Sequence, residues 1–261
     1  MSKFKYTQFP TDGELVLKDP EHEYFYNDEK IPMSVTQTAE MFFEPFNYKR
    51  VARNIHQKYP HSMYWNKDLN VIEDKLRKKG DNSMKMGTEF HRVAEYFYTN
   101  GECISDITYP DDIAPQVKSF LNFASKWKKN GNVCVGVEVL IMFMKLICGA
   151  VDALFWNTVT KQLYMVDWKR AKCFKKGEYF SKKQGKYPMD CVKDTSFGKY
   201  VYQQNMYKFI LSCYGVNVDK MFIVRFHNED FEVIEIEDLQ DNIKRAIGVI
   251  VEKETRYLCE E

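Results

Sequence analysis

The sequence predicts an α/β fold: an α/β/α sandwich with a central mixed sheet and an N-terminal helical elaboration. Two observations lead to this prediction. The expected elements follow the order helices, an antiparallel strand meander, a helix, a strand pair and a closing helix, which favours a mixed sheet flanked by helices. Hydrophobic residues make up 44% of the 261 residues and charged residues 29%, which is typical of a soluble globular protein. Because no linker-like or repeated segment divides the chain, we expect one domain, with residues 1–80 as a loop and helical elaboration, 81–236 as the core and 237–261 as a closing helix.

Helical periodicity locates the main helices. The clearest one is expected to begin near Ser83 or Gly87. Its apolar residues recur at i, i+3, i+4 and i+7, which puts them on one face. They are Phe90, Val93, Ala94 and Phe97. Further helices are expected over residues 113–128, 200–214 and 239–257, and Ser34 offers an N-cap for a short helix that Pro45 ends.

Five segments rich in Val, Ile, Leu and Phe indicate strands. They are residues 135–144, 146–156, 163–168, 221–226 and 231–236. The stretch from Val133 to Trp156 is apolar enough to suggest a membrane span, but it contains Glu138, Lys145 and Asp152. Each of these charges would cost about 2.5–3.5 kcal/mol at a bilayer centre, so we expect two strands and no membrane partner.

Three acidic residues, Glu138, Asp152 and Asp167, lie inside these apolar strands. A buried carboxylate is costly unless a cation compensates it. A turn centred at Val159-Thr160 would pair Asp152 with Asp167. A turn at Lys145, which lacks the usual Gly, Pro or Asn, would pair Glu138 with Asp152. Cβ atoms of direct cross-strand neighbours lie about 4.5–5.5 Å apart, so the three carboxylates would form an oxygen-rich site suited to Mg²⁺ or Mn²⁺.

The tripeptide Asp167-Trp168-Lys169 adds a cation to this group. Residues two apart share a strand face, so Lys169 is expected beside Asp167 while Trp168 points away. A fixed ammonium there can orient a water or stabilise charge that develops on an attacked phosphate. A structural cluster of ion pairs explains the same residues without any metal or catalysis.

Five short elements follow one another in a recognisable order. They are Gly87-Thr88-Glu89-Phe90-His91, the isolated Glu138, Gly149-Ala150-Val151-Asp152, Asp167-Trp168-Lys169 and Gln203-Gln204-Asn205-Met206-Tyr207. This set resembles the G-x-x-x-H, Glu, G-x-x-D, D-x-K and Q-x-x-x-Y motifs of the RecB-type branch of the PD-(D/E)XK nuclease superfamily. Residues 31–36 also resemble the I-P-S-V-T opening of related exonucleases from large DNA viruses and of mitochondrial genome-maintenance exonucleases, with Met33 inserted before the Ser. The resemblance covers roughly residues 24–247.

The resemblance implies a restriction-endonuclease-like core and a function. The chain would hydrolyse DNA phosphodiester bonds with one or two Mg²⁺ or Mn²⁺ ions, as an exonuclease in replication, recombination or repair. Each matching residue would have a role. His91, Asp152, Asp167 and the main-chain carbonyl of Trp168 would be metal ligands, Glu138 would support the metal shell or the water, Lys169 would position or activate the water, and Gln203 and Tyr207 would contact a DNA phosphate or Lys169.

A dense basic segment follows Lys169. Between Lys169 and Lys186 there are eight basic residues and one acid, Glu178, although the whole chain carries a net charge of only +1. Phosphate contacts act locally, so this segment is well placed to guide DNA into the site. The residues expected to bind DNA there are Arg170, Lys172, Lys175, Lys176, Lys182 and Lys183. A solvated loop is the ordinary alternative for such a charge run.

Other features limit the possible functions. The seven cysteines form no Cys-x-x-Cys pair, so no iron–sulfur cluster is expected. The odd cysteine count and the absence of a hydrophobic leader predict an intracellular location, cytoplasmic by default, with nuclear, organellar or viral-factory locations left open. No ATP-binding motif is present, so any helicase activity would belong to a partner, and the expected protein partners are a helicase or a recombination protein. The alternatives are an endonuclease or RNA-cutting enzyme of the same fold, a silent nucleic-acid-binding module, and a structural interaction protein.

Overall fold

The computed structural model describes residues 4–18, 23–58, 64, 67–171 and 183–260. Within these residues a seven-stranded mixed sheet forms the centre of the molecule, with the order β1-β6-β7-β8-β9-β10 and β5 beside β7. Three pairings, β1 with β6, β5 with β7 and β8 with β9, are parallel, and the others are antiparallel. The strands are β1 (Gln8–Phe9), β5 (Met33–Ser34), β6 (Asn132–Phe143), β7 (Ile147–Asn157), β8 (Gln162–Arg170), β9 (Lys220–His227) and β10 (Asp230–Glu235).

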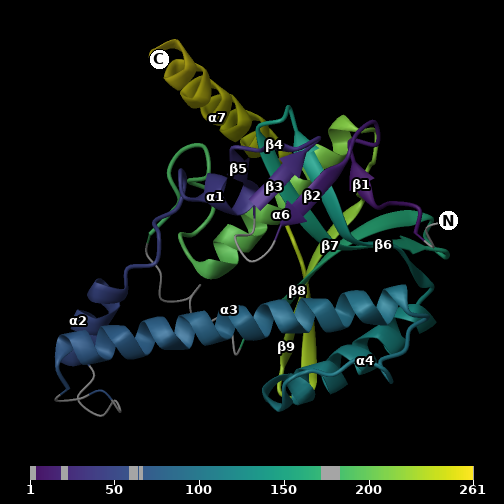
Figure 1. The fold of residues 1–261 in the computed structure, drawn as a ribbon, viewed down its shortest axis with the longest axis horizontal. Coiled ribbons are helices and arrows are strands. Elements are labelled where there is room, and N and C mark those ends of the chain that lie inside the picture. The colour runs from purple at the N-terminus through teal and green to yellow at the C-terminus, as the bar shows by residue number, and fades with distance from the viewer. Residues whose placement is uncertain (1–3, 19–22, 59–63, 65–66, 172–182, 261) are drawn as a thin grey trace.

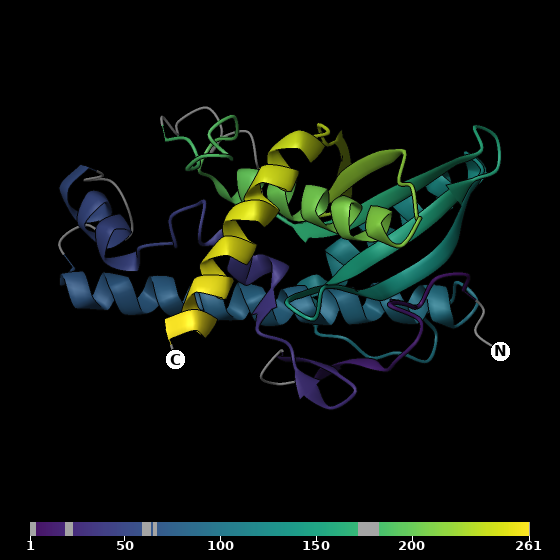
Figure 2. The ribbon, with the colours of Figure 1, turned by 90° about the horizontal axis from the view of Figure 1, so that it is seen from above.

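Helices cover both faces of this sheet, which confirms the predicted sandwich (Figures 1 and 2). One face packs against α3 (Leu69–Thr99), the 3₁₀ turn η1 (Asp111–Ile113) and α4 (Ala114–Lys129), and we call the apolar layer between them the α3-side core. The other face packs against α1 (Val35–Ala39), α6 (Ser196–Cys213) and α7 (Gln240–Glu260), and that layer is the α6-side core. The four apolar residues expected on one face of α3 are all buried in the α3-side core.

Both predicted strand registers are confirmed. In β7 and β8, Ala153 pairs with Val166, so Asp152 and Asp167 occupy the next positions along the two strands. The Asn157 side chain closes this turn by accepting hydrogen bonds from two main-chain N–H groups, at 2.9 and 2.7 Å.

The register of β6 and β7 places Glu138 across from Asp152, between the pairs Val137–Ala153 and Val139–Val151. The connecting turn contains no glycine. Instead, Met144 and Lys145 both adopt left-handed conformations, with φ of 52° and 53°.

The start of α3 was predicted incorrectly. The helix begins at Leu69, with Asp68 as its N-cap, and continues through Gly80 and Gly87. Glycine disfavours a helix interior by about 1 kcal/mol, which made a later start plausible. At Gly80 the helix is in close contact with α2 (Tyr48–Lys58), because the Tyr48 hydroxyl lies against the glycine. A Cβ atom added at residue 80 would be only 2.5 Å from that hydroxyl, so glycine is what lets α2 approach.

The N-terminal region also differs from the expected loops and helices. It forms a separate three-stranded antiparallel sheet of β2 (Leu15–Lys18), β3 (Glu23–Tyr26) and β4 (Glu29–Lys30). Asn27 and Asp28 adopt positive φ values of 48° and 66°, as the tight turn between β3 and β4 requires. Tyr24 and Tyr26 alternate inward and pack against the hairpin end of β6 and β7, so this small sheet extends the core. The short α1 does begin at the predicted cap, where Ser34 and Gln37 form a capping box.

The structure also bears on the apolar stretch that begins at Val133. It forms strands, and among the described residues no helix combines the length and apolar character needed to cross a membrane.

Candidate active site

Glu138 and Asp152 lie where two neighbouring strands reverse their inward and outward alternation. On β6, Val137 is buried in the α3-side core, but Val139 is buried in the α6-side core. Residues two apart normally share a face, so the strand must turn over between them. Glu138 has a φ of 45°, a conformation that residues other than glycine rarely adopt. Such a residue costs on the order of 1–3 kcal/mol and is typically retained at functional sites.

The same reversal occurs opposite, on β7. Val151 is buried in the α6-side core, whereas Ala153 is buried in the α3-side core. Asp152 is between them, 7% exposed. The reversals in the two strands therefore bring the carboxylates of Glu138 and Asp152 together, at the position where each strand changes the core it faces.

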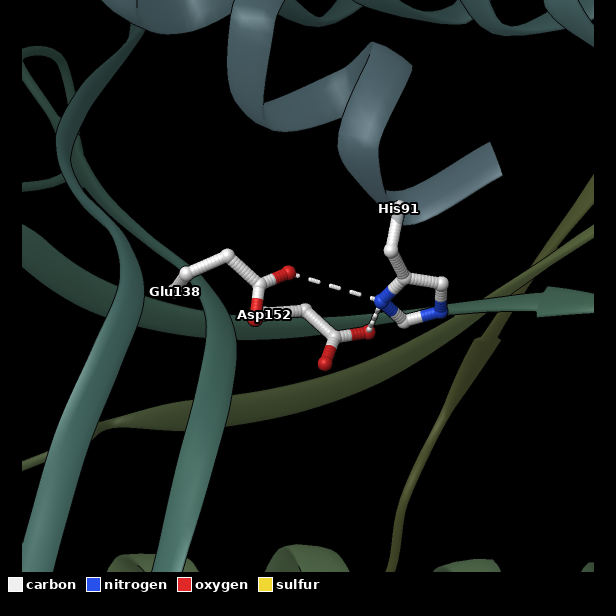
Figure 3. Close-up of side chains that lie close together, drawn as sticks. All are labelled: His91, Glu138 and Asp152. Carbon is white, nitrogen blue, oxygen red and sulfur yellow. Dashed lines mark ion pairs between the residues drawn. The ribbon is translucent and has the colours of Figure 1, made fainter. Parts of the chain in front are cut away.

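His91 approaches this point from α3 (Figure 3). Its Nδ1 atom is 3.5 Å from Glu138 Oε1 and 3.6 Å from Asp152 Oδ2. Its Nε2 atom is 3.1 Å from the main-chain oxygen of Trp168. Because that carbonyl can only accept, the Nε2 atom carries a proton in this contact. The Nδ1 atom therefore faces two carboxylates and needs either a second proton or a cation in front of it.

The electrostatics agree with this geometry. Burial lowers the pKa of His91, but Asp152 and Glu138 outweigh burial and raise it to about 9. Burial raises the pKa of Asp152 above its usual range. Among the described residues, Glu138 Oε1 is buried with no hydrogen-bond partner, which is uncommon for a carboxylate oxygen. Without a metal ion, a protonated His91 is thus the cation that compensates these acids.

The second half of the site lies on β8, facing α6. Asp167 is 1% exposed. The Lys169 ammonium lies 2.9 Å from its Oδ1 and 2.8 Å from its Oδ2, and Gln204 Nε2 donates to Oδ1 at 3.1 Å. Burial raises the pKa of Asp167 to about 6, although Lys169 acts to lower it. Burial also lowers the pKa of Lys169, but Asp167 and Asp152 outweigh it and keep the side chain an ammonium.

Asp152 connects the two halves. Its Oδ2 atom accepts a hydrogen bond from the Trp168 main-chain N–H at 2.7 Å. The last pair between β7 and β8 is Ala153–Val166. The Trp168 N–H lies beyond that pair, so it is available to the Asp152 side chain. The Trp168 indole points away from Asp167, as expected, and is buried in the α3-side core against Phe120 and Phe123.

The side chains of His91, Glu138 and Asp152 could together hold a metal ion, since one ligand atom from each lies within 4.8 Å of the others. Two of the four expected ligands, His91 and Asp152, belong to this group. Glu138, expected in a supporting role, also belongs to it. Asp167 is bound instead by Lys169 and Gln204, and the Trp168 carbonyl contacts His91.

The residues expected to bind nucleic acid are more scattered. Gln203 Nε2 donates to the Tyr207 hydroxyl at 2.9 Å, and Tyr207 is 4% exposed, so only Gln203 is partly accessible. Arg170 is half-buried. Lys183 is exposed and forms an ion pair with Glu44 at 2.7 Å. The remaining candidates, Lys172, Lys175, Lys176 and Lys182, lie outside the described residues.

The sequence did not identify two residues of the site, Gln204 and Tyr200. Both are on α6, four residues apart and hence on one helical face. Gln204 holds Asp167, and the Lys169 ammonium lies 4.9 Å from the centre of the Tyr200 ring. Each residue along a helix turns by about 100°, so Gln204 faces a different direction from Gln203, but the sequence alone does not indicate which of the two faces Asp167.

Comparison with known proteins adds little to this geometry. No protein-family profile and no curated protein matches the chain. One similar solved structure, titled "Crystal structure of SSO0001", has 17% sequence identity and a TM-score of 0.28, over 62% of this chain and 70% of that one. A likeness at this level carries no argument about function.

Proposed function

We propose that this protein is a Mg²⁺- or Mn²⁺-dependent nuclease that hydrolyses DNA phosphodiester bonds from strand ends. One observation carries the proposal: His91 Nδ1 faces the carboxylates of Glu138 and Asp152 at 3.5 and 3.6 Å, and the Asp167–Lys169 pair lies on the adjoining strand. The ordered motifs that resemble the RecB-type nuclease branch support it, since four of the five contribute directly to this cluster.

The donor set fits a divalent metal ion. One imidazole nitrogen and two carboxylates suit Mn²⁺ or Mg²⁺, the second of which keeps several waters as further ligands. Glu138 Oε1, which forms no hydrogen bond with another described residue and faces His91 Nδ1 at 3.5 Å, is available as a metal ligand. Three carboxylates against Lys169 leave a formal charge of about −2, which a protonated His91 only halves, whereas a divalent ion bound in place of that proton would cancel it. When bound, such an ion lowers the pKa of an attacking water and neutralises charge on the phosphate.

The chain's own residues would provide positioning and charge. Gln204 fixes the Asp167 carboxylate, and Asp167 in turn fixes the Lys169 ammonium. Little reorganisation of these groups is therefore needed during the reaction. The Lys169 ammonium has further protons to donate, to a non-bridging phosphate oxygen or to the attacking water. Trp168 fixes Asp152 through its main-chain N–H and orients His91 through its carbonyl.

The preference for DNA ends rests on the resemblance alone. An endonuclease or RNA-cutting enzyme would use the same cluster and differ only in the substrate path. A silent nucleic-acid-binding module has no need to concentrate three carboxylates beside phosphates, because they repel DNA. A purely structural ion-pair cluster predicts no tight divalent-metal site.

The test is a nuclease assay on purified protein with and without Mg²⁺ or Mn²⁺. Substrates are linear and circular DNA, single- and double-stranded, labelled at each end, with RNA alongside. Lys169→Ala should abolish cleavage. Lys208→Ala is the matched control, because the Lys208 side chain has the same 17% exposure and also pairs with an aspartate.

Each outcome separates the alternatives. Metal-dependent loss of end label from linear DNA, absent in Lys169→Ala and present in Lys208→Ala, supports the proposal and reveals the polarity. Cutting of circular DNA indicates an endonuclease. Cleavage that persists in Lys169→Ala, or wild-type protein that binds DNA without cleaving it, contradicts the proposal.

A further inference from the structure

We propose that α2, carried on the first half of α3, is a phosphate-binding arm that holds the DNA strand leading into the active site. This inference rests on the proposed function, since it names how the same site takes its substrate. We call α2 together with residues 69–85 of α3 the arm. Figure 1 shows that this part of α3 extends beyond the sheet, with α2 lying beside it.

The arm is firmly attached to the helix that carries His91. Ile72 on α3 and Ala52 on α2 are buried, at 0% and 2% exposure. The Tyr48 ring of α2 lies against Gly80, and the Arg77 guanidinium stacks 4.7 Å from the centre of that ring. Because α3 is one continuous helix, the position of α2 relative to His91 is set by helix geometry.

That geometry places α2 on the active-site side of α3. Gly80 and His91 are eleven residues apart, which is about three full turns, so they project from nearly the same face. The rise between them is about 16 Å. The intervening face is open: Met84 is 65% exposed, and a Cβ atom added to Gly87 would meet nothing within 4 Å. Successive phosphates of a duplex strand are about 3.4 Å apart along the axis, so this distance spans about five phosphates.

Charge is concentrated in the arm. It contains nine Lys or Arg residues and three Asp or Glu residues, a balance of +6, whereas the whole chain has a net charge of +1. The rest of the chain therefore carries about −5 when the same residue types are counted. The α2 helix contains no acidic residue at all.

Two cations of α2 are available to a ligand. Lys49 and Arg53 are exposed, lie four residues apart on one helical face, and form no ion pair with another described residue. Lysines elsewhere are commonly paired, as in Lys118–Glu229 and Lys128–Glu102. Unpaired cations can bind phosphates without breaking an existing contact.

A further cationic position lies just before α3 begins. The Lys67 ammonium lies beside that of Lys75, and this neighbour lowers the pKa of Lys67. Two like charges held together repel each other, and an anion between them would relieve the repulsion. A polyanion therefore fits the arm, and its position on the His91 side favours the substrate strand over an acidic membrane surface.

The experiment compares the full-length wild type with Lys49→Gln/Arg53→Gln. The control is Lys129→Gln/Lys161→Gln, which removes two exposed lysines at the end of α4 and at the β7–β8 turn. Binding of end-labelled single-stranded DNA of about 30 nucleotides is measured by anisotropy in EDTA over a range of salt concentrations. We expect the arm variant to bind roughly tenfold more weakly and the magnitude of its salt-dependence slope on single-stranded DNA to fall by about 1.4, with the control unchanged. Equal binding by all three proteins overturns the inference.

Cleavage kinetics provide a second readout. On long DNA the arm variant should show a raised KM with an unchanged kcat, because it loses contacts made equally in the ground and transition states. On a dinucleotide, which is too short to reach α2, it should match the wild type. An equal defect on both substrates would mean that the substitution disturbs the active site, and would overturn the inference.

Two further outcomes separate this inference from the proposed function. If the wild type never cleaves but its DNA binding depends on the arm, the arm stands and the nuclease proposal fails. If the wild type cleaves DNA and the arm variant binds and cleaves DNA as the wild type does, the arm inference fails and the nuclease proposal stands. Phosphatidylserine vesicles test the other source of anionic groups: vesicle binding that Lys49→Gln/Arg53→Gln abolishes, with DNA binding intact, would overturn the inference.

Discussion

Gly149 on β7 lies directly against the ring of Tyr207 on α6. A Cβ atom at Gly149 would be 2.5 Å from Tyr207 Cε1 and 3.2 Å from its hydroxyl oxygen. Gly149 is three residues before Asp152, and Tyr207 is three residues after Gln204. This contact therefore sets how closely α6, with its hold on Asp167, approaches the strand that carries Asp152.

We expect Gly149→Ala to destabilise the protein by about 1–3 kcal/mol, because the buried Tyr207 ring must move. The free energy of unfolding, from urea denaturation, measures this. In a Tyr207→Ala background the same substitution should cost less, giving a coupling of at least about 0.5 kcal/mol. Gly87→Ala is the control: a Cβ there meets nothing within 4 Å, so helix propensity should make it neutral or stabilising. Simple additivity of Gly149→Ala and Tyr207→Ala would contradict the steric explanation.

The strand pairing could be predicted from the sequence because it depends on local information. The turns at Val159-Thr160 and Lys145 fix which residues face each other, and a register slip of one residue would move every buried side chain to the wrong face. The predicted positions of Glu138, Asp152 and Asp167 followed from those two turns. Their roles as ligands and catalytic groups stay predictions.

Other features depend on tertiary packing and could not be predicted. The left-handed conformation of Glu138 arises because its neighbours Val137 and Val139 are buried in different cores, which the apolar pattern of one strand does not reveal. The close approach of Tyr48 to Gly80 inside α3 involves two separate helices, so the apolar pattern of neither helix reveals it. Gln204 was missed because α6 is buried on much of its circumference, so hydrophobic periodicity does not indicate which polar residue turns inward.

The conformation of Glu138 leads to a prediction about stability. Glu138→Gly should be more stable than Glu138→Ala by about 1 kcal/mol, because glycine adopts a positive φ without steric cost. Both variants remove the carboxylate and should weaken Mn²⁺ binding equally. Urea denaturation in EDTA and calorimetric Mn²⁺ titration measure the two effects. If the Ala variant is the more stable, the backbone at residue 138 is not held in the left-handed region.

The pKa of His91 predicts how the stability of the metal-free protein depends on pH. In the folded state this pKa is about 9, above the ordinary value of 6.5. The folded state then binds the proton more tightly, so the stabilisation is complete below about pH 6.5 and is lost as the pH rises through 9. The loss for one such group is on the order of 3 kcal/mol.

Thermal unfolding in EDTA, measured from about pH 6 to about pH 9.5, should show this loss in the wild type and not in His91→Gln. Saturating Mn²⁺ should remove the decline, because a divalent cation takes the place of the proton. If His91→Gln loses stability over this range as steeply as the wild type, then His91 is not the group responsible, and the proposed cation position beside Glu138 and Asp152 is wrong.

Gln203 and Gln204 are adjacent on α6 but should affect different kinetic constants. Gln204 donates to Asp167 Oδ1 at 3.1 Å, so Gln204→Met removes support from the carboxylate that holds Lys169. If the proposed nuclease function holds, we expect kcat to fall about 10- to 100-fold with little change in KM, because Gln204 acts on Lys169 only through Asp167. Gln203 instead bonds to Tyr207 and is partly accessible, so Gln203→Met should mainly raise KM. Steady-state kinetics on end-labelled DNA distinguish the two variants. The same loss of kcat in both would indicate a general disturbance of α6 rather than a specific hold on Asp167.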